Sequence, residues 1–168
     1  MTTRRSAARG GDRRDGPDDS FGGTYYDARN EATRRGDRTI GTEHLVLALL
    51  TDPGSPAAAA LGCDLDSARR ALDALDRQAL AAIGVPAGIT AGAAPVRSAG
   101  RLRLTPAAKA VVAGARNARG NREAGLGIVL GALLDLRRPD PAAELLAALG
   151  VDGRAARERW AGSGQDGP

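Results

Sequence analysis

Residues 40–50 read Ile-Gly-Thr-Glu-His-Leu-Val-Leu-Ala-Leu-Leu, a short polar start followed by an unbroken apolar run. Thr42 is predicted to be the N-cap of a helix from Glu43 to Leu50, because a threonine hydroxyl can accept a hydrogen bond from an unpaired backbone N–H group. This helix is apolar on nearly every side, which is typical of a helix in the middle of a bundle. The segment therefore indicates a helical bundle built around it.

The sequence on both sides of this run predicts three more helices. Residues 25–35 lack glycine and proline, and a helix there is broken at Gly36. Downstream, Ser55 and Pro56 form a helix start, and this short helix ends at Gly62. Asp64 can cap a fourth helix, whose apolar residues recur at three- and four-residue spacing and predict one amphipathic face: Leu65, Ala68, Leu72, Leu75 and Ala79.

The same order of signals returns in the second half of the chain. Helices are predicted from Pro106 to about Arg119 and over 126–136, after a loop bracketed by Gly120 and Gly125. A further helix over 142–149 follows a cap-and-proline start at Asp140-Pro141, and Asp152 is the predicted N-cap of the last helix. The residue types match as well, since Ala-Leu-Gly-Cys-Asp at 60–64 corresponds to Ala-Leu-Gly-Val-Asp at 148–152. The chain therefore contains an internal repeat of roughly 85 residues.

The repeat predicts an all-α fold, an eight-helix pseudo-duplicated bundle of two four-helix repeats that form one domain. We expect a first repeat at 24–83, a second and degenerate repeat at 105–161, and a flexible linker at 84–104, where glycine, alanine and proline replace the periodic pattern. Residues 1–23 and 162–168 are expected to be disordered tails, because they offer little apolar surface to bury.

The composition excludes several classes of protein. With 168 residues the chain has room for one ordinary domain, and an aromatic content of 2% argues against the base-stacking surfaces of single-strand binders. The 24 basic and 20 acidic residues alternate, which favours a mixed solvated surface. One cysteine and one histidine are too few for a disulfide or a zinc site, and there is no apolar run long enough for export or for spanning a membrane. We expect a cytoplasmic protein with no membrane segment.

No arrangement of residues predicts an enzyme. Lys109 lies in Ala-Ala-Lys-Ala rather than in a glycine-rich phosphate loop, so no ATP site and no cofactor are predicted. Cys63 and His44 could in principle form a nucleophile–base pair. Cys63 is better explained as a small buried thiol, because the other copy of the repeat has Val151 in its place. His44 is expected to pack and to hydrogen-bond locally.

The run at 40–50, together with Ala-Leu-Gly-Cys-Asp-Leu at 60–65, resembles the repeat of the Clp chaperone N-terminal domain of the ClpC and ClpA type. Leu-Thr-Pro-Ala-Ala-Lys at 104–109 is similar to the opening of the family's second repeat, so the resemblance covers about residues 24–160. The chain departs from the family in two places. Gly22-Gly23 is expected to shorten the first helix, and Gly-Leu-Gly-Ile at 125–128 stands where the family has Gly-Thr-Glu-His.

The resemblance implies a stand-alone, non-catalytic binding module in protein quality control. It would recognise protein substrates, adaptors or Clp-directed ligands, and its partners could include a Clp ATPase or protease complex. In ClpC-type domains the positions that match Thr42, Glu43 and His44 line a pocket for phosphoarginine on substrate proteins. A purely structural reading, with Thr42 as N-cap and Glu43 as a first-turn acid, explains these residues equally well.

Two alternatives stay open. The chain could be a decoy that sequesters small molecules directed at Clp proteins. It could also be a helical nucleic-acid binder that uses the arginines of the N-terminal tail together with Arg101, Arg103, Arg116, Arg119 and Arg122. The interleaved acidic residues argue against this second alternative.

Overall fold

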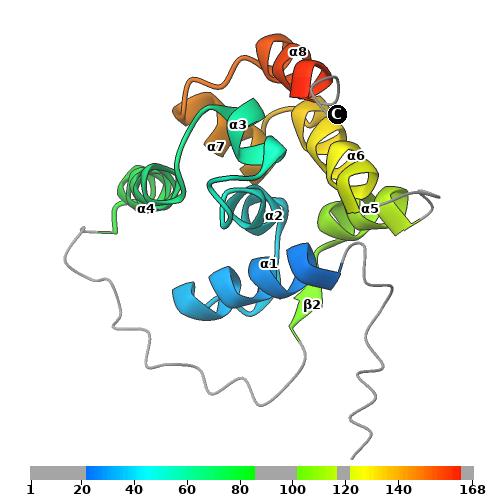
Figure 1. Ribbon diagram of the computed structural model, residues 1–168. Helices are drawn as coiled ribbons and strands as arrows, with labels where there is room; N and C mark the ends of the chain where they lie inside the picture. The colour runs from blue at the N-terminus through cyan, green and yellow to red at the C-terminus, as the bar shows by residue number, and fades with distance from the viewer. Residues whose placement is uncertain (1–21, 86–101, 117–121, 164–168) are drawn as a thin grey trace, which may run out of the picture.

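The computed structural model describes residues 22–85, 102–116 and 122–163, which form eight helices and two short strands (Figure 1). The elements of the first half are α1 (Gly22–Arg35), β1 (Thr39–Ile40), α2 (Thr42–Leu49), α3 (Pro56–Leu61) and α4 (Leu65–Ala82). Those of the second half are β2 (Arg103–Leu104), α5 (Pro106–Arg116), α6 (Arg122–Asp135), α7 (Pro141–Ala148) and α8 (Gly153–Ser163). The predicted all-α fold, an eight-helix bundle of two repeats, is confirmed.

The predicted N-caps of α3, α4, α7 and α8 are confirmed. Each N-cap side chain accepts a backbone N–H from the first turn of its helix, and the N-caps are Ser55 for α3, Asp64 for α4, Asp140 for α7 and Asp152 for α8. Gly62 and Gly150 follow α3 and α7 with φ angles of +70° and +68°. Glycine adopts this left-handed conformation without the steric cost that a Cβ atom adds.

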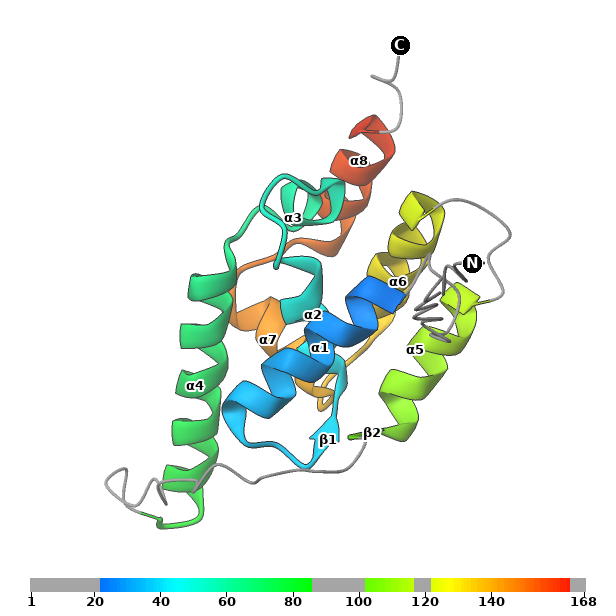
Figure 2. The same ribbon diagram turned by 60° about the horizontal axis from the view of Figure 1, so that its bottom comes forward.

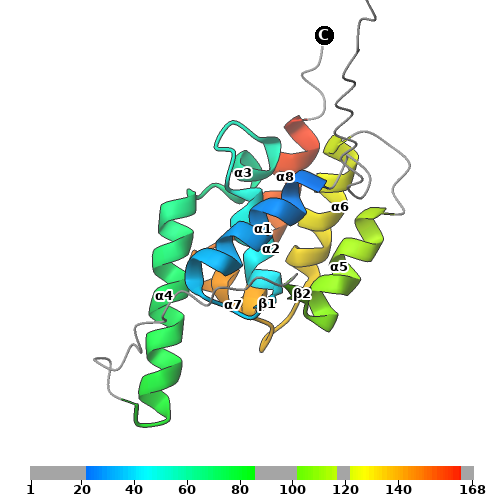
Figure 3. The same cartoon turned by 90° about the horizontal axis from the view of Figure 1, so that it is seen from below.

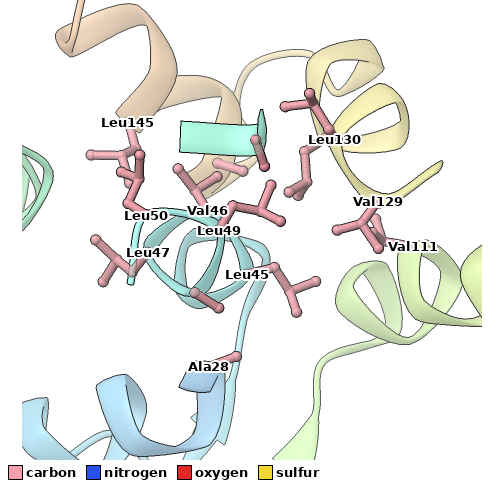
Figure 4. Close-up of a cluster of buried hydrophobic side chains, with 14 of the residues drawn as sticks. Ala28, Leu45, Val46, Leu47, Leu49, Leu50, Val111, Val129, Leu130 and Leu145 are labelled. Carbon is pink, nitrogen blue, oxygen red and sulfur yellow. The ribbon is translucent and has the colours of Figure 1, made fainter. Parts of the chain in front are cut away.

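Helix α2 lies in the centre of the bundle, and Glu43 is its one residue that is not buried. Figure 4 shows the side chains of α2 and of Leu50, its C-cap, radiating in several directions, with Leu45 toward α5 and Leu50 beside Leu145 of α7. Val129 of α6 continues this cluster toward α5. Burial of one leucine side chain contributes roughly 1.5–3 kcal/mol, so α2 is the main source of hydrophobic stabilisation. The prediction of a central helix is confirmed.

Helices of each repeat pack against helices of the other repeat. Helix α3 of the first repeat packs against α8 of the second, and α7 of the second packs against α4 of the first, as the views in Figures 1 and 2 show. Helices α2 and α7 are also in contact, and so are α6 and α3. A parallel pairing of β1 with β2, in which Thr39 is opposite Arg103 and Ile40 opposite Leu104, adds a further link. Each repeat therefore completes the core of the other.

The two copies of the Ala-Leu-Gly sequence, at 60–62 and 148–150, lie close together where the two repeats pack against each other. A pocket of 330 Å³ is lined by residues of both copies, and Arg159 of α8 lies beside it. The Nε–H group of Arg159 donates to the carbonyl oxygen of Ala60 over 2.8 Å, at the C-terminal end of α3. A cation is favourable at a helix C-terminus, so this contact stabilises the α3–α8 pairing.

Helix α4 runs along one side of the bundle, and its C-terminal end extends past α1 and α7 (Figure 3). Two ion-pair clusters hold it to α1. Glu31, which is 6% exposed, binds Arg69, and Arg35 binds Asp73 and Asp76. The predicted apolar face is buried only in part: Ala68 and Leu72 are in the core, whereas Ala79 is exposed.

Three element boundaries differ from the sequence-based expectation. Helix α1 begins at Gly22 and not at Tyr25, so the glycine pair does not shorten it. The burial of Thr24 and Ala28 outweighs a cost of roughly 0.5–1 kcal/mol for each helical glycine. Helix α6 begins at Arg122 and includes Gly125, which was expected in a loop. The segment expected to be a linker contains β2 and the buried Leu102, and residues 162–163 continue α8. Residues 86–101 of the predicted linker and residues 1–21 and 164–168 of the predicted tails lie outside the described residues.

Candidate binding site at the start of α2

The N-cap of α2 is Gly41, with φ −93° and ψ 179°, and Thr42 is the first helical residue. The prediction that Thr42 caps this helix is therefore wrong. The ring of His44 faces this helix start: its Nδ1 atom lies 3.0 Å from the backbone nitrogen of Gly41, close enough to accept that N–H when the ring is neutral. Because Thr42 is the first helical residue and not the N-cap, its hydroxyl does not cap α2 and has another partner.

The Thr42 hydroxyl binds the other repeat. It donates to Oδ1 of Asp140 over 2.7 Å and accepts the backbone N–H of Ala142 over 3.3 Å. Asp140 is itself the N-cap of α7 and accepts the same Ala142 N–H over 2.9 Å. With 1% of its surface exposed, Thr42 is a buried link between the N-termini of α2 and α7.

His44 is also buried, at 1% exposure, and lies between two carboxylates. Its Nε2 atom is 2.9 Å from Oδ2 of Asp37, and its Nδ1 atom is 3.1 Å from Oε1 of Glu43. Burial alone would lower the pKa of His44, but the hydrogen bonds and charges of Asp37 and Glu43 outweigh it and raise that pKa to about 9. The hydrogen bond from His44, opposed by burial and aided by Arg35, lowers the pKa of Asp37.

Glu43 is the predicted site residue with access to solvent, since 17% of its side chain is exposed. Its Oε1 atom faces His44, while its Oε2 atom is buried and has no hydrogen-bond partner. The carboxylate lies directly over Gly41, where a Cβ atom would be 2.3 Å from both oxygens. Glycine at position 41 is thus required for this placement of the Glu43 carboxylate.

The second repeat has no equivalent site, and the structure provides a physical reason. Gly127 of α6 stands in the place that Glu43 has in the first repeat, and the indole of Trp160 covers it. A Cβ atom on Gly127 would be 2.8 Å from Cζ2 of Trp160, so no larger side chain fits. Leu126, at the position of Thr42, has no hydroxyl to offer.

Cys63 differs from the prediction of a buried thiol, because it is partly exposed. It lines a groove of 570 Å³ between the end of α2 and the start of α4. Burial, aided by the charge of Asp64, raises the pKa of Cys63, which disfavours the reactive thiolate. Both ring nitrogens of His44 are engaged by other groups, so His44 is not a base for Cys63.

Three further expectations from the sequence concern a metal site, a membrane-spanning helix and an arginine-rich surface. Within the ranges that the structure describes, no three histidine, cysteine or acidic side chains are grouped so as to hold a metal ion. None of the described helices combines the length and apolarity that crossing a bilayer requires. Of the five arginines in the nucleic-acid alternative, the side chain of Arg103 is exposed, and the other four lie outside the described side chains.

Residues 19–137 match the model of the Clp repeat N-terminal domain, more than half of the chain. The chain forms an eight-helix bundle of two interlocked repeats, and its central helix starts with Gly-Thr-Glu-His. This is the architecture of a helical binding domain. The chain belongs to the Clp repeat N-terminal domain family. This confirms the resemblance inferred from residues 40–50. The family is one of non-catalytic helical domains. Comparison with curated proteins finds no match.

Sequence reasoning identified Thr42, Glu43 and His44 but missed the groups that hold them. Asp37 carried no signal beyond a turn after a glycine, and its approach to His44 depends on the angle between α1 and α2. Asp140 was recognised as a helix cap, yet its contact with a residue 98 positions earlier follows only from the packing of the two repeats against each other.

Proposed function

We propose that the chain is a non-catalytic binding module that recognises protein substrates or adaptors of a Clp system in protein quality control, in the cytoplasm. Membership in the Clp repeat N-terminal domain family supports this proposal, as does the lack of a phosphate-loop motif in the sequence. The decoy alternative would use the same site for a small molecule. The module binds its partner without transforming it.

We place the binding site at the start of α2, with Glu43 as the residue that contacts the ligand. The observation that carries this assignment is the Glu43 carboxylate, which is partly exposed and has one oxygen without a hydrogen-bond partner. A guanidinium group offers paired N–H donors that match a carboxylate. The ligand class is therefore a peptide with a guanidinium group, and phosphoarginine is the form that the family resemblance suggests.

Thr42 and His44 belong to this proposed site as supporting residues. Both are buried, so they act through Glu43 and the helix start and not by direct contact with a large ligand. Thr42 fixes the helix start against α7, and His44 orients the Glu43 carboxylate. The phosphate of a phosphoarginine would be received near the N-terminus of α2, where the helix dipole favours an anion.

The experiment is a calorimetric titration of a phosphoarginine peptide into wild type and Glu43→Gln. We expect one site per chain, because Trp160 fills the equivalent place in the second repeat. Loss of a charge-assisted hydrogen bond costs about 1.5–3 kcal/mol, which is roughly a 10- to 160-fold loss of affinity in Glu43→Gln.

Glu144→Gln is the matched control, since Glu144 is an acid in the first turn of α7. This variant makes the same change of charge and should bind as wild type does. Two equivalent sites, or equal affinity in Glu43→Gln, would contradict the proposed site. A pull-down from native lysate with the wild type and Glu43→Gln as bait then tests for a Clp ATPase or its clients as partners.

A further inference from the structure

Two groups compete for one atom of His44. The Nδ1 atom lies 3.0 Å from the backbone nitrogen of Gly41 and 3.1 Å from Oε1 of Glu43. The N–H group of Gly41 can only donate, so it needs the lone pair of a neutral Nδ1. The Glu43 carboxylate can only accept, so it needs a proton on Nδ1. Protonation of the ring therefore decides which of the two His44 binds.

The charges around the ring are few and are arranged on its two sides. Asp37, at the end of α1, faces Nε2 and is itself bound by Arg35, while Glu43 faces Nδ1. From α7, Asp140 is engaged by the Thr42 hydroxyl. With this set the pKa of His44 is about 9, so at neutral pH the ring is charged and holds Oε1 of Glu43.

The oxygens of Glu43 are in different states. Oε1 is bound to the ring of His44, whereas Oε2 has no partner. A guanidinium group that binds a carboxylate with two parallel N–H donors needs both oxygens. An ammonium group is a point charge that a single carboxylate oxygen satisfies, so it does not require Oε1 to leave His44.

We propose that a proton on His44 and a guanidinium ligand on Glu43 compete for the same carboxylate oxygen, so that binding of the ligand releases the proton from His44. This inference rests on the proposed function and adds its regulation. When the guanidinium takes Oε1, the Nδ1 proton passes to the solvent buffer, and Nδ1 then accepts the N–H of Gly41. The site is thus selective for guanidinium over ammonium in a pH-dependent way.

The first arm of the test uses the free protein. His44 is the only histidine of the chain, so its NMR titration is unambiguous. An opposite charge within about 4–6 Å moves a pKa by about 1–3 units, and we expect the pKa of His44 to fall by about 1 unit or more in Glu43→Gln. Gly41→Ala should lower it as well, because the added Cβ displaces the carboxylate while its charge is kept.

The second arm measures binding of the phosphoarginine peptide and of the same peptide with lysine in its place. Titrations in buffers of different ionisation enthalpy report the protons released. For the phosphoarginine peptide we expect up to one proton per bound peptide and an affinity that rises up to about tenfold per pH unit between pH 7 and 9. The lysine peptide, and Gly41→Ala with either peptide, should show little dependence on pH.

The outcomes separate the two proposals. Binding of the phosphoarginine peptide with no proton release and no pH dependence overturns the competition and leaves the proposed function standing. If this peptide does not bind at all, the guanidinium ligand class proposed for Glu43 is overturned, and the first arm decides the link between His44 and Glu43. A His44 pKa equal to that of the wild type in both Glu43→Gln and Gly41→Ala then overturns the link.

Discussion

The hydroxyl of Thr42 lies 2.7 Å from Oδ1 of Asp140, and this contact joins the first residue of the central helix of one repeat to the N-cap of α7 in the other. The contact has no counterpart in the pseudo-symmetric position, where Leu126 replaces Thr42. The start of α2 is thus joined to the other repeat by a polar side-chain bond, whereas the start of α6 has no hydroxyl at the matching position.

Thr42→Val tests this bond. The variant keeps the shape of the side chain but removes the hydroxyl, and Asp140 still caps α7 through the N–H of Ala142. We expect the free energy of unfolding, measured in urea, to fall by about 1–2 kcal/mol. Thr51→Val is the matched control, because the Thr51 hydroxyl makes a long bond of 3.4 Å at an exposed position and should cost little.

A double-mutant cycle of Thr42→Val with Asp140→Ala isolates the pair. We expect a coupling energy of about 1 kcal/mol, since the two side chains share one hydrogen bond. If the two losses simply add, Thr42 stabilises the helix start without Asp140, and our account of the bond between the repeats is incorrect.

His44 predicts a loss of stability at alkaline pH. Its pKa is raised in the folded state to about 9, from 6.5, so its contribution is fully present below pH 6.5 and is lost as the pH rises through about 9. The difference corresponds to about 3 kcal/mol of unfolding free energy. Urea unfolding at pH 6 and pH 9.5 measures it, in a Cys63→Ala background that removes the titrating thiol.

Asp37→Asn is the comparison for this pH dependence, because it removes the carboxylate that faces Nε2 of His44. We expect the loss of stability between the two pH values to shrink in this variant. A wild-type protein whose unfolding free energy is flat from pH 6 to pH 9.5 would show that His44 is not held in its charged form.

Alanine substitutions at two glycines of α6 are expected to change the free energy of unfolding in opposite directions. A Cβ atom on Gly127 would be 2.8 Å from the Trp160 indole, whereas one on Gly131 meets nothing within 4 Å. Gly127→Ala should lower the free energy of unfolding by about 1–3 kcal/mol and shift the fluorescence of Trp160, the only tryptophan. Gly131→Ala should raise stability by up to about 1 kcal/mol, because alanine favours helix. Equal effects would mean that the indole does not lie on Gly127.

Local signals were sufficient to predict most of the fold. The caps at Ser55, Asp64 and Asp152 were predictable because each depends on residues within one turn of its own helix. The repeat was predictable because short sequence segments in the two halves of the chain match, as at 60–64 and 148–152. The cap of α2 was not, because threonine and glycine are both common N-cap residues, and the local sequence does not show that the Thr42 hydroxyl binds Asp140 instead.

The candidate site was predictable in its residues but not in its geometry. Nothing in the local sequence indicates that Thr42 binds a residue of the other repeat or that Asp37 faces His44. These contacts depend on how whole helices pack, which is decided by the sum of many apolar contacts. For the same reason Gly125 was expected in a loop, although its place in α6 is buried.

Because α3 and α4 of the first repeat pack against α8 and α7 of the second, the pair of repeats is the smallest part of this protein that has a complete core. A chain cut between the repeats would give two fragments, each with an unpaired apolar face that fits only the other. Such halves are suited to reassemble from separate polypeptides, as the parts of a split reporter do. The second repeat, although it lacks the polar start of the first, is therefore needed as the complement of the first.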